Sequence, residues 1–302
     1  MDKLFLALDW TPNINHIGFF VAESLGFYND VGIEIKISDP AEDDYKITPA
    51  KKVEIGQADL ALCPTESLIA YRTKSSPFDL KAIAAIFQKD LSAIAVSKNS
   101  NIHSPENLSG KHYASYQAKY EDKIVEQMIN KDGGAANLEI SYPKKLGIWD
   151  TLLEGKADAT WIFLNWEGVE AKQKGAELRY FKLEDYGIPY SYSPVIAASE
   201  STIKKKADAL HNFTKATKKG FLYAQNNPEE SIAILKAAIP AKDADIDLNQ
   251  ALKASVDAFQ SEGEWGKMQP DRFKKFVEWL KEKGMEKQDI EAESLYTNQF
   301  LE

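Results

Sequence analysis

The tetrapeptide Gly56-Gln57-Ala58-Asp59 returns later in the chain as Gly155-Lys156-Ala157-Asp158, and this repeat decides the fold. Each copy stands between a segment with the apolar spacing of a helix and a short apolar run typical of a buried strand. The glycine of each copy supplies the left-handed backbone with which helices commonly end. The repeat therefore predicts two units in which the same corner between helix and strand recurs.

Outward from each copy, the sequence predicts the same order of elements. The first unit is expected to contain strand 4–8, helix 16–24, strand 33–37, helix 48–55 and strand 58–62. The second is expected to contain strand 111–115, helix 120–131, strand 138–142, helix 147–154 and strand 159–163. Such alternation predicts the α/β class, with parallel sheets and right-handed crossovers. Ligands of these sheets bind outside the carboxyl ends of the strands, so the loops after residues 8, 62, 115 and 163 form the candidate site.

A chain of 302 residues has room for two domains at about 150 residues each. The repeat predicts that these domains are not consecutive halves. Crossovers at 82–97 and 190–199 would join a first lobe of residues 1–90 plus 195–302 to a second lobe of residues 91–194. After residue 204 the pattern is strongly helical, with expected helices 204–226, 231–238, 248–260 and 271–283. Two crossovers favour a hinge between the lobes.

Composition excludes several classes of function. The net charge is −9, from 37 Lys and Arg against 46 Asp and Glu, and no basic block suits nucleic acid or a membrane surface. No apolar run is long enough to predict a membrane span. The single cysteine, Cys63, excludes an internal disulfide and a cysteine-rich metal site, and the four histidines are scattered, so no metal is expected. The apolar run at residues 4–8 is too short for a secretory signal, so we expect a cytoplasmic protein, or a periplasmic one if this is a processed form.

Aromatic, amide and carboxylate side chains concentrate in the loops after the predicted strands. Aromatic faces suit a flat heteroaromatic ligand, while carboxylates and amides bind ring nitrogens and an exocyclic amine. The candidate ligand-binding residues are Asp9, Trp10, Asn13, His16, Thr65, Glu66, Tyr116, Tyr120, Trp161, Asn165, Trp166, Glu167 and Tyr190. Mostly apolar walls with a few placed polar groups are the usual makeup of a small-molecule pocket.

Structural roles compete with ligand binding for several of these side chains. Trp10 and Trp166 also fit a core position, and His16 also fits the start of the first helix. Glu167 also fits the first turn of a helix, where a carboxylate interacts favourably with the helix dipole. Cys63 is expected to be a small buried hydrophobe rather than a nucleophile, and the two aspartates of the repeat are expected to fix turns. No nucleophile elbow, Walker loop or zinc-protease motif occurs, so no catalytic residue is predicted.

The segment Leu8–Asn13, followed by His16, resembles the opening of solute-binding proteins for pyrimidine precursors of thiamine and of the related yeast-type hydroxymethylpyrimidine phosphate synthases. Gly26-Phe27-Tyr28, followed by Gly32-Ile33, is similar to another segment of that family. Ser104–Lys111 and the two copies of the repeat are similar to segments shared with sulfonate- and nitrate-type binding proteins, so they indicate the fold rather than the ligand.

The resemblance implies a two-lobed type II periplasmic-binding-protein fold with two hinge crossovers and a helical C-terminal region. It implies that Trp10 and an aromatic residue from 186–192 hold an aminopyrimidine ring between them. Glu167 would accept hydrogen bonds from the amine, with Asn13 and Asn165 nearby. An ABC transporter permease is the implied partner if the protein serves transport.

The chain departs from the synthases where they carry their chemistry. The resemblance places a lysine that holds pyridoxal phosphate and a consumed histidine where this chain has Cys63 and Ser67. The cysteine-rich segment of the synthases corresponds to residues 187–194, which contain no cysteine. A cysteine cannot form the Schiff base with which a lysine holds pyridoxal phosphate.

We therefore expect a solute-binding protein that closes on an aminopyrimidine precursor of thiamine, for transport or salvage, without a cofactor. One alternative is a pyrimidine-biosynthesis enzyme with altered catalytic residues, which would use pyridoxal phosphate. Another is a binding protein for a different small organic solute. An anionic solute is disfavoured because none of the three arginines lies in a predicted cleft loop.

Overall fold

The computed structural model describes residues 1–259 and 264–301, which form two compact units. The first unit comprises residues 1–90, 191–277 and 288–302, and the second comprises residues 91–190 and 278–287. The first unit ends at residue 90 and resumes at residue 191. The chain passes from one unit to the other four times, where two crossovers were expected.

Segment 278–287, expected in the first lobe, belongs to the second unit because Glu286 is bonded there. The Glu286 carboxylate accepts hydrogen bonds from Tyr120 Oη at 2.5 Å and from Lys119 Nζ at 2.8 Å. These partners lie far away in sequence, so no local pattern reveals the exchange.

The first unit is built on a five-stranded mixed sheet in the order β2-β1-β3-β10-β4. Its strands are β1 (Asp2–Ala7), β2 (Ile33–Ser38), β3 (Leu60–Cys63), β4 (Leu80–Ala85) and β10 (Val195–Ser199). Strand β1 is parallel to β2 and β3, whereas β10 is antiparallel to β3 and β4. Central strands covered on both faces need apolar residues at every position, and all four residues of β3 are buried.

The second unit repeats this plan in the order β7-β6-β8-β5-β9. Its strands are β5 (Ser92–Ser97), β6 (His112–Ala114), β7 (Glu139–Ser141), β8 (Ala159–Phe163) and β9 (Leu178–Phe181). Strand β6 is parallel to β7 and β8, and β5 is antiparallel to β8 and β9. The predicted α/β class and the internal repeat are therefore confirmed, but the sheets are mixed rather than parallel, because β10 and β5 each run antiparallel to both of their neighbours.

The two aspartates of the repeat have the same structural role in each unit. Asp59 Oδ2 accepts a hydrogen bond from Phe5 N at 3.0 Å, and Asp158 Oδ2 accepts one from His112 N at 2.9 Å. Each aspartate thus ties the corner before one strand to the neighbouring parallel strand, which confirms that these residues fix turns.

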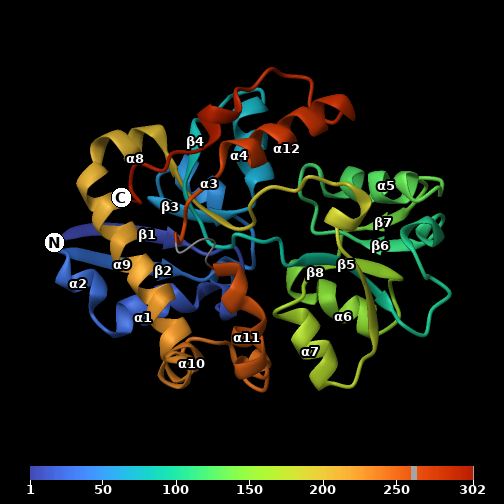
Figure 1. Cartoon of the computed structure of the whole chain (residues 1–302), viewed down its shortest axis with the longest axis horizontal. Helices are drawn as coiled ribbons and strands as arrows, with labels where there is room; N and C mark the ends of the chain where they lie inside the picture. Colours follow the sequence, from blue (N-terminus) through green and yellow to red (C-terminus); the bar gives the residue numbers. More distant parts are fainter. Residues whose placement is uncertain (260–263, 302) are drawn as a thin grey trace. The chain divides into compact units, whose positions relative to one another are not determined.

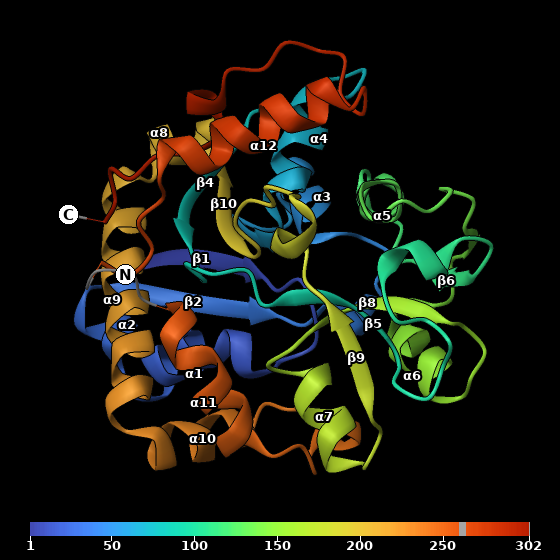
Figure 2. The ribbon, with the colours of Figure 1, turned by 45° about the vertical axis from the view of Figure 1, so that its right-hand side comes forward.

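Helices flank both sheets. In the first unit, α1 and α11 lie on one side of β1 and β2, and α3 and α4 lie on the other (Figure 1, Figure 2). The helices are α1 (Ile17–Ser24), α2 (Phe27–Asp30), α3 (Pro49–Glu54), α4 (Thr65–Thr73), α5 (Glu121–Lys131), α6 (Ile148–Leu153), α7 (Glu167–Gln173), α8 (Glu200–Lys205), α9 (Ala207–Asn226), α10 (Pro228–Lys236), α11 (Leu248–Phe259) and α12 (Pro270–Glu282). Within the described ranges, no helix has the length and apolar character needed to cross a bilayer.

Helices α1 and α9 approach each other closely through two glycines. A Cβ atom on Gly220 would lie 2.0 Å from the Gly18 carbonyl oxygen, and one on Gly18 would lie 2.1 Å from the Phe221 ring. Neither position has room for a side chain. This contact holds α1, which follows the first strand-end loop, against the long helix α9.

Candidate ligand-binding site

The candidate residues lie in or near strand-end loops of the two units. In the first unit these loops follow the parallel strands β1 and β3, and in the second they follow β6 and β8.

Asn13 gives the loop after β1 its shape. Its side-chain oxygen accepts a hydrogen bond from Asn15 N at 2.8 Å, and its side-chain amide donates to the Thr11 carbonyl at 2.9 Å. Asn13 is buried and caps the short helical turn Ile14–His16. Both ends of its amide therefore hold the loop itself.

His16 orients the carboxylate of Asp9. Asn13 N donates to His16 Nδ1 at 3.3 Å, so the proton of the neutral ring resides on Nε2. His16 Nε2 lies 2.9 Å from Asp9 Oδ1 and donates to it. The His16 side chain is 0 % exposed, whereas that of Asp9 is 24 % exposed. The structure thus places His16 beneath the loop and leaves Asp9 as the group that solvent can reach.

Trp10, the neighbour of Asp9, packs against Tyr45. The two ring centroids lie 4.8 Å apart, with the ring planes inclined at 49°. Tyr45 Oη accepts a hydrogen bond from Thr11 N at 3.2 Å, and burial raises the pKa of the Tyr45 phenol. Trp10 is half-buried, and its ring is supported by that of Tyr45.

Sequence reasoning missed Tyr45. It lies in a polar stretch without helix or strand periodicity, where Asp44 and Tyr45 both adopt left-handed backbone with φ of 53° and 57°. Two successive non-glycine residues in this region are strained, and such strain tends to occur at functional sites. No local sequence signal predicts that the chain turns Tyr45 back under Trp10.

Thr65 and Glu66, expected in a loop after β3, form the first turn of α4. Thr65 donates from its hydroxyl to the Tyr192 carbonyl at 2.8 Å, which ties α4 to the segment before β10. Glu66 is buried in a helix turn where its charge interacts favourably with the dipole. Cys63 is buried and burial raises the pKa of its thiol, which confirms its expected role as a small hydrophobe.

In the second unit, the loop after β6 folds around Glu121. Its carboxylate accepts hydrogen bonds from Tyr116 N at 3.0 Å, from Ala118 N at 3.2 Å and from Tyr113 Oη at 2.8 Å. Burial raises the pKa of Glu121, opposed by these hydrogen bonds. Glu121 was not among the predicted site residues, because a glutamate at a helix start is ordinary in sequence.

Tyr120 is 2 % exposed and bonded to Glu286, so it anchors segment 278–287. Tyr116, by contrast, is half-buried at the strand end.

The loop after β8 buries most of its predicted residues. Asn165, Trp166 and Glu167 are 0 %, 4 % and 8 % exposed. Glu167 lies in the first turn of α7, as the structural alternative predicted, and its Oε2 accepts a hydrogen bond from Phe163 N at 2.9 Å. Trp161 packs against the half-buried Tyr190, with ring centroids 5.4 Å apart.

Four of the predicted residues combine partial exposure with a place in or beside these loops. They are Asp9 and Trp10 in the first unit and Tyr116 and Tyr190 in the second. In the first unit, the Trp10 ring and the oriented Asp9 carboxylate can bind a flat ring that carries a hydrogen-bond donor. In residues 1–259 and 264–301, no three His, Cys, Asp or Glu side chains gather as a metal site.

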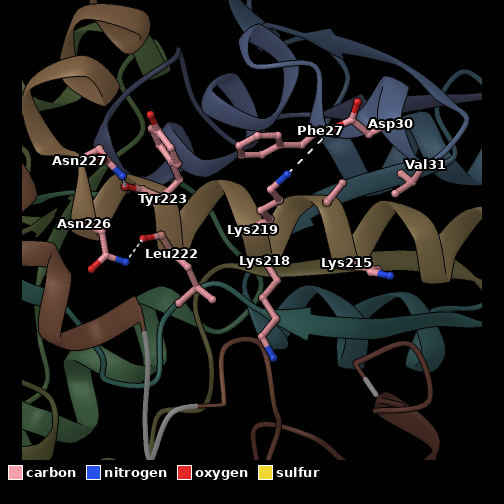
Figure 3. A pocket seen from close by; sticks show the side chains of 11 residues that line it. Phe27, Asp30, Val31, Lys215, Lys218, Lys219, Leu222, Tyr223, Asn226 and Asn227 are labelled. Atoms are coloured by element: carbon pink, nitrogen blue, oxygen red, sulfur yellow. Dashed lines mark hydrogen bonds and ion pairs between the residues drawn. The ribbon is translucent and has the colours of Figure 1, made fainter.

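A separate hollow of about 550 Å³ lies between α2 and α9, away from these loops. Figure 3 shows its lining, with Lys219 extending over the Phe27 ring and toward Asp30. None of the predicted site residues contributes to this hollow.

The family described as NMT1/THI5 like matches residues 13–231 of the chain. The formylaminopyrimidine-binding protein of Halalkalibacterium halodurans is 24% identical over 236 residues, which cover 78% of this chain and 70% of that protein. The 4-amino-5-hydroxymethyl-2-methylpyrimidine phosphate synthase of Legionella pneumophila is 24% identical over 242 residues, which cover 79% of this chain and 74% of the synthase. The predicted resemblance is therefore confirmed, for both the binding and the synthase branch.

Among solved structures, the alkanesulfonate-binding protein SsuA of Xanthomonas axonopodis pv. citri, bound to MOPS, superposes with a TM-score of 0.73 at 13% identity. The match covers 98% of this chain and 98% of that structure. At this identity the likeness concerns the fold, and it confirms the predicted periplasmic-binding-protein architecture.

Proposed function

The chain belongs to the NMT1/THI5-like family, and from this premise we propose that it is a solute-binding protein for an aminopyrimidine precursor of thiamine. The relative named for binding formylaminopyrimidine matches most of the chain and supports this proposal.

The observation that carries the proposal is the pairing of Trp10 with Asp9 in the loop after β1. The Trp10 ring, supported by Tyr45, offers a face on which a pyrimidine ring stacks. The neighbouring Asp9 carboxylate, held by His16, is an acceptor for the exocyclic amine. Such a pair recognises a flat, uncharged ring with an amino group.

A thermal-shift screen tests the proposal, with hydroxymethylpyrimidine, formylaminopyrimidine, thiamine and pyridoxal phosphate as ligands. We expect the aminopyrimidines to raise the melting temperature of the wild-type protein. The Trp10→Phe variant keeps a ring and retains most of the shift, whereas Trp10→Ala loses it. An equal shift in all three proteins, or none with any pyrimidine, would contradict the assignment.

The match to the synthases makes an enzyme of pyrimidine biosynthesis the second candidate. At the position where the resemblance places the lysine, this chain has Cys63, which is buried at the end of β3. We therefore propose that the protein binds ligand without pyridoxal phosphate. Absorbance of a pyridoxal Schiff base, lost on treatment with borohydride, would favour the enzyme instead.

Delivery to an ABC transporter permease is the proposed role in transport, and hand-over to a salvage enzyme is the alternative. Transport requires an exported protein, whereas salvage operates in the cytoplasm. Fractionation of cells that express the natural gene distinguishes the two locations.

A further inference from the structure

The loop after β6 has the geometry of an anion-binding cradle. Gln117 adopts left-handed backbone with φ of 63°, which brings the N–H groups of Tyr116 and Ala118 to one concave side. Turns of this kind bind anions through successive backbone N–H groups. The loop follows a central parallel strand, where ligands of such sheets bind.

The side chain of Glu121 fills this cradle. Its carboxylate accepts from both N–H groups and from the Tyr113 hydroxyl, and the residue is 3 % exposed. Because all three of these partners donate, the arrangement satisfies the ionised carboxylate.

Burial lowers the pKa of Lys145, and the charge of Glu121 opposes this, while Asp122 adds a like charge near Glu121. The second unit contains one arginine, Arg179, and its guanidinium donates to the Ile102 carbonyl. Removing the Glu121 carboxylate would therefore leave the two backbone N–H groups and the Tyr113 hydroxyl without this acceptor.

We propose that Glu121 is a specificity-determining residue, a built-in anion that occupies the cradle of the second unit and excludes ligands carrying a phosphate, sulfonate or carboxylate group. Which ligands are excluded rests on the proposed function, because the excluded anion is the phosphate ester of the uncharged pyrimidine that the protein binds. The occupied cradle itself does not depend on that function.

The cradle is tested by anion binding to the Glu121→Ala variant. Melting temperatures are measured in sodium sulfate and in sodium chloride of equal ionic strength, because sulfate stabilises folded proteins in general. We expect a saturable extra stabilisation by sulfate in Glu121→Ala that is absent from the wild type and from Glu126→Ala, a carboxylate loss on the same helix. Equal responses in all three proteins would overturn the proposal.

The near-isosteric Glu121→Gln variant keeps the test decisive if Glu121→Ala does not fold. Calorimetry compares hydroxymethylpyrimidine with its phosphate ester, and we expect the preference for the uncharged ligand to fall about tenfold in Glu121→Gln. An unchanged preference would overturn the proposal. If the wild type binds no pyrimidine while Glu121→Ala is stabilised by sulfate, the proposed function is wrong, but the proposal that Glu121 occupies an anion-binding loop is supported.

Discussion

Replacement of His16 by asparagine or glutamine separates its two hydrogen bonds. Asparagine has a polar atom near the position of Nδ1 and can still accept from Asn13 N, but it does not reach Asp9. Glutamine has its amide near the position of Nε2 and can still donate to Asp9 Oδ1, which lies 2.9 Å from Nε2 in the wild type. The two variants therefore remove one interaction each.

The expected losses follow from the geometry. His16→Asn removes a hydrogen bond to a charged acceptor, about 1.5–3 kcal/mol, and leaves a small cavity because His16 is fully buried. His16→Gln removes a neutral hydrogen bond of about 1 kcal/mol. In His16→Asn, the Asp9 side chain has lost the hydrogen bond that orients it. Its ordering on ligand binding costs about 0.5–1.5 kcal/mol of binding free energy, so ligand affinity falls about 2- to 10-fold in this variant alone.

Urea denaturation measures the stability of each variant, and calorimetry with formylaminopyrimidine measures its affinity. Equal affinities in the two variants, at stabilities that keep both folded, would refute the view that His16 acts through Asp9.

Two further predictions concern the fold. Asp59→Ala and Asp158→Ala should each destabilise by about 1–3 kcal/mol in urea denaturation, because each leaves a backbone N–H without its carboxylate partner; no effect from either would contradict their shared role. Glu200 is held by Arg72 at 3.1 Å and Lys81 at 3.2 Å, and the Arg72 hydrogen bond lowers its pKa from the usual 4.5. Because the pKa of Glu200 is lower in the folded state, its charge stabilises the fold at pH values above the usual pKa, and this contribution is lost as the pH falls. Glu200→Gln should therefore cost about 1 kcal/mol or less at pH 7 and nothing in strong acid. A cost independent of pH would contradict this reading.

Much of the fold follows from local patterns in the sequence. The repeated corner at Asp59 and Asp158 predicts both sheets, because the same residue types at the same spacing must make the same turn twice. The strand ends then locate Asp9 and Trp10, since ligands of parallel sheets bind at that edge. These inferences need only periodicity and the chemistry of glycine and aspartate.

The remaining features depend on contacts between residues far apart in sequence or on unusual backbone. Tyr45 packs against Trp10 where Asp44 and Tyr45 adopt left-handed backbone, and the polar sequence around them does not predict this conformation. Segment 278–287 joins the second unit through Glu286, whose partner Tyr120 was predicted as a ligand contact. The Glu121 carboxylate finds its donors in a loop whose turn the sequence does not specify.

The proposed function depends most directly on the binding of an aminopyrimidine at Trp10. Isothermal titration calorimetry with formylaminopyrimidine tests this on the wild-type protein, Trp10→Phe and Trp10→Ala. Stacking of a base on an aromatic side chain contributes about 1–3 kcal/mol, so we predict binding to the wild type, near-normal affinity in Trp10→Phe and a loss of about tenfold or more in Trp10→Ala. No measurable binding by the folded wild type, or equal affinity in Trp10→Ala, would contradict the account.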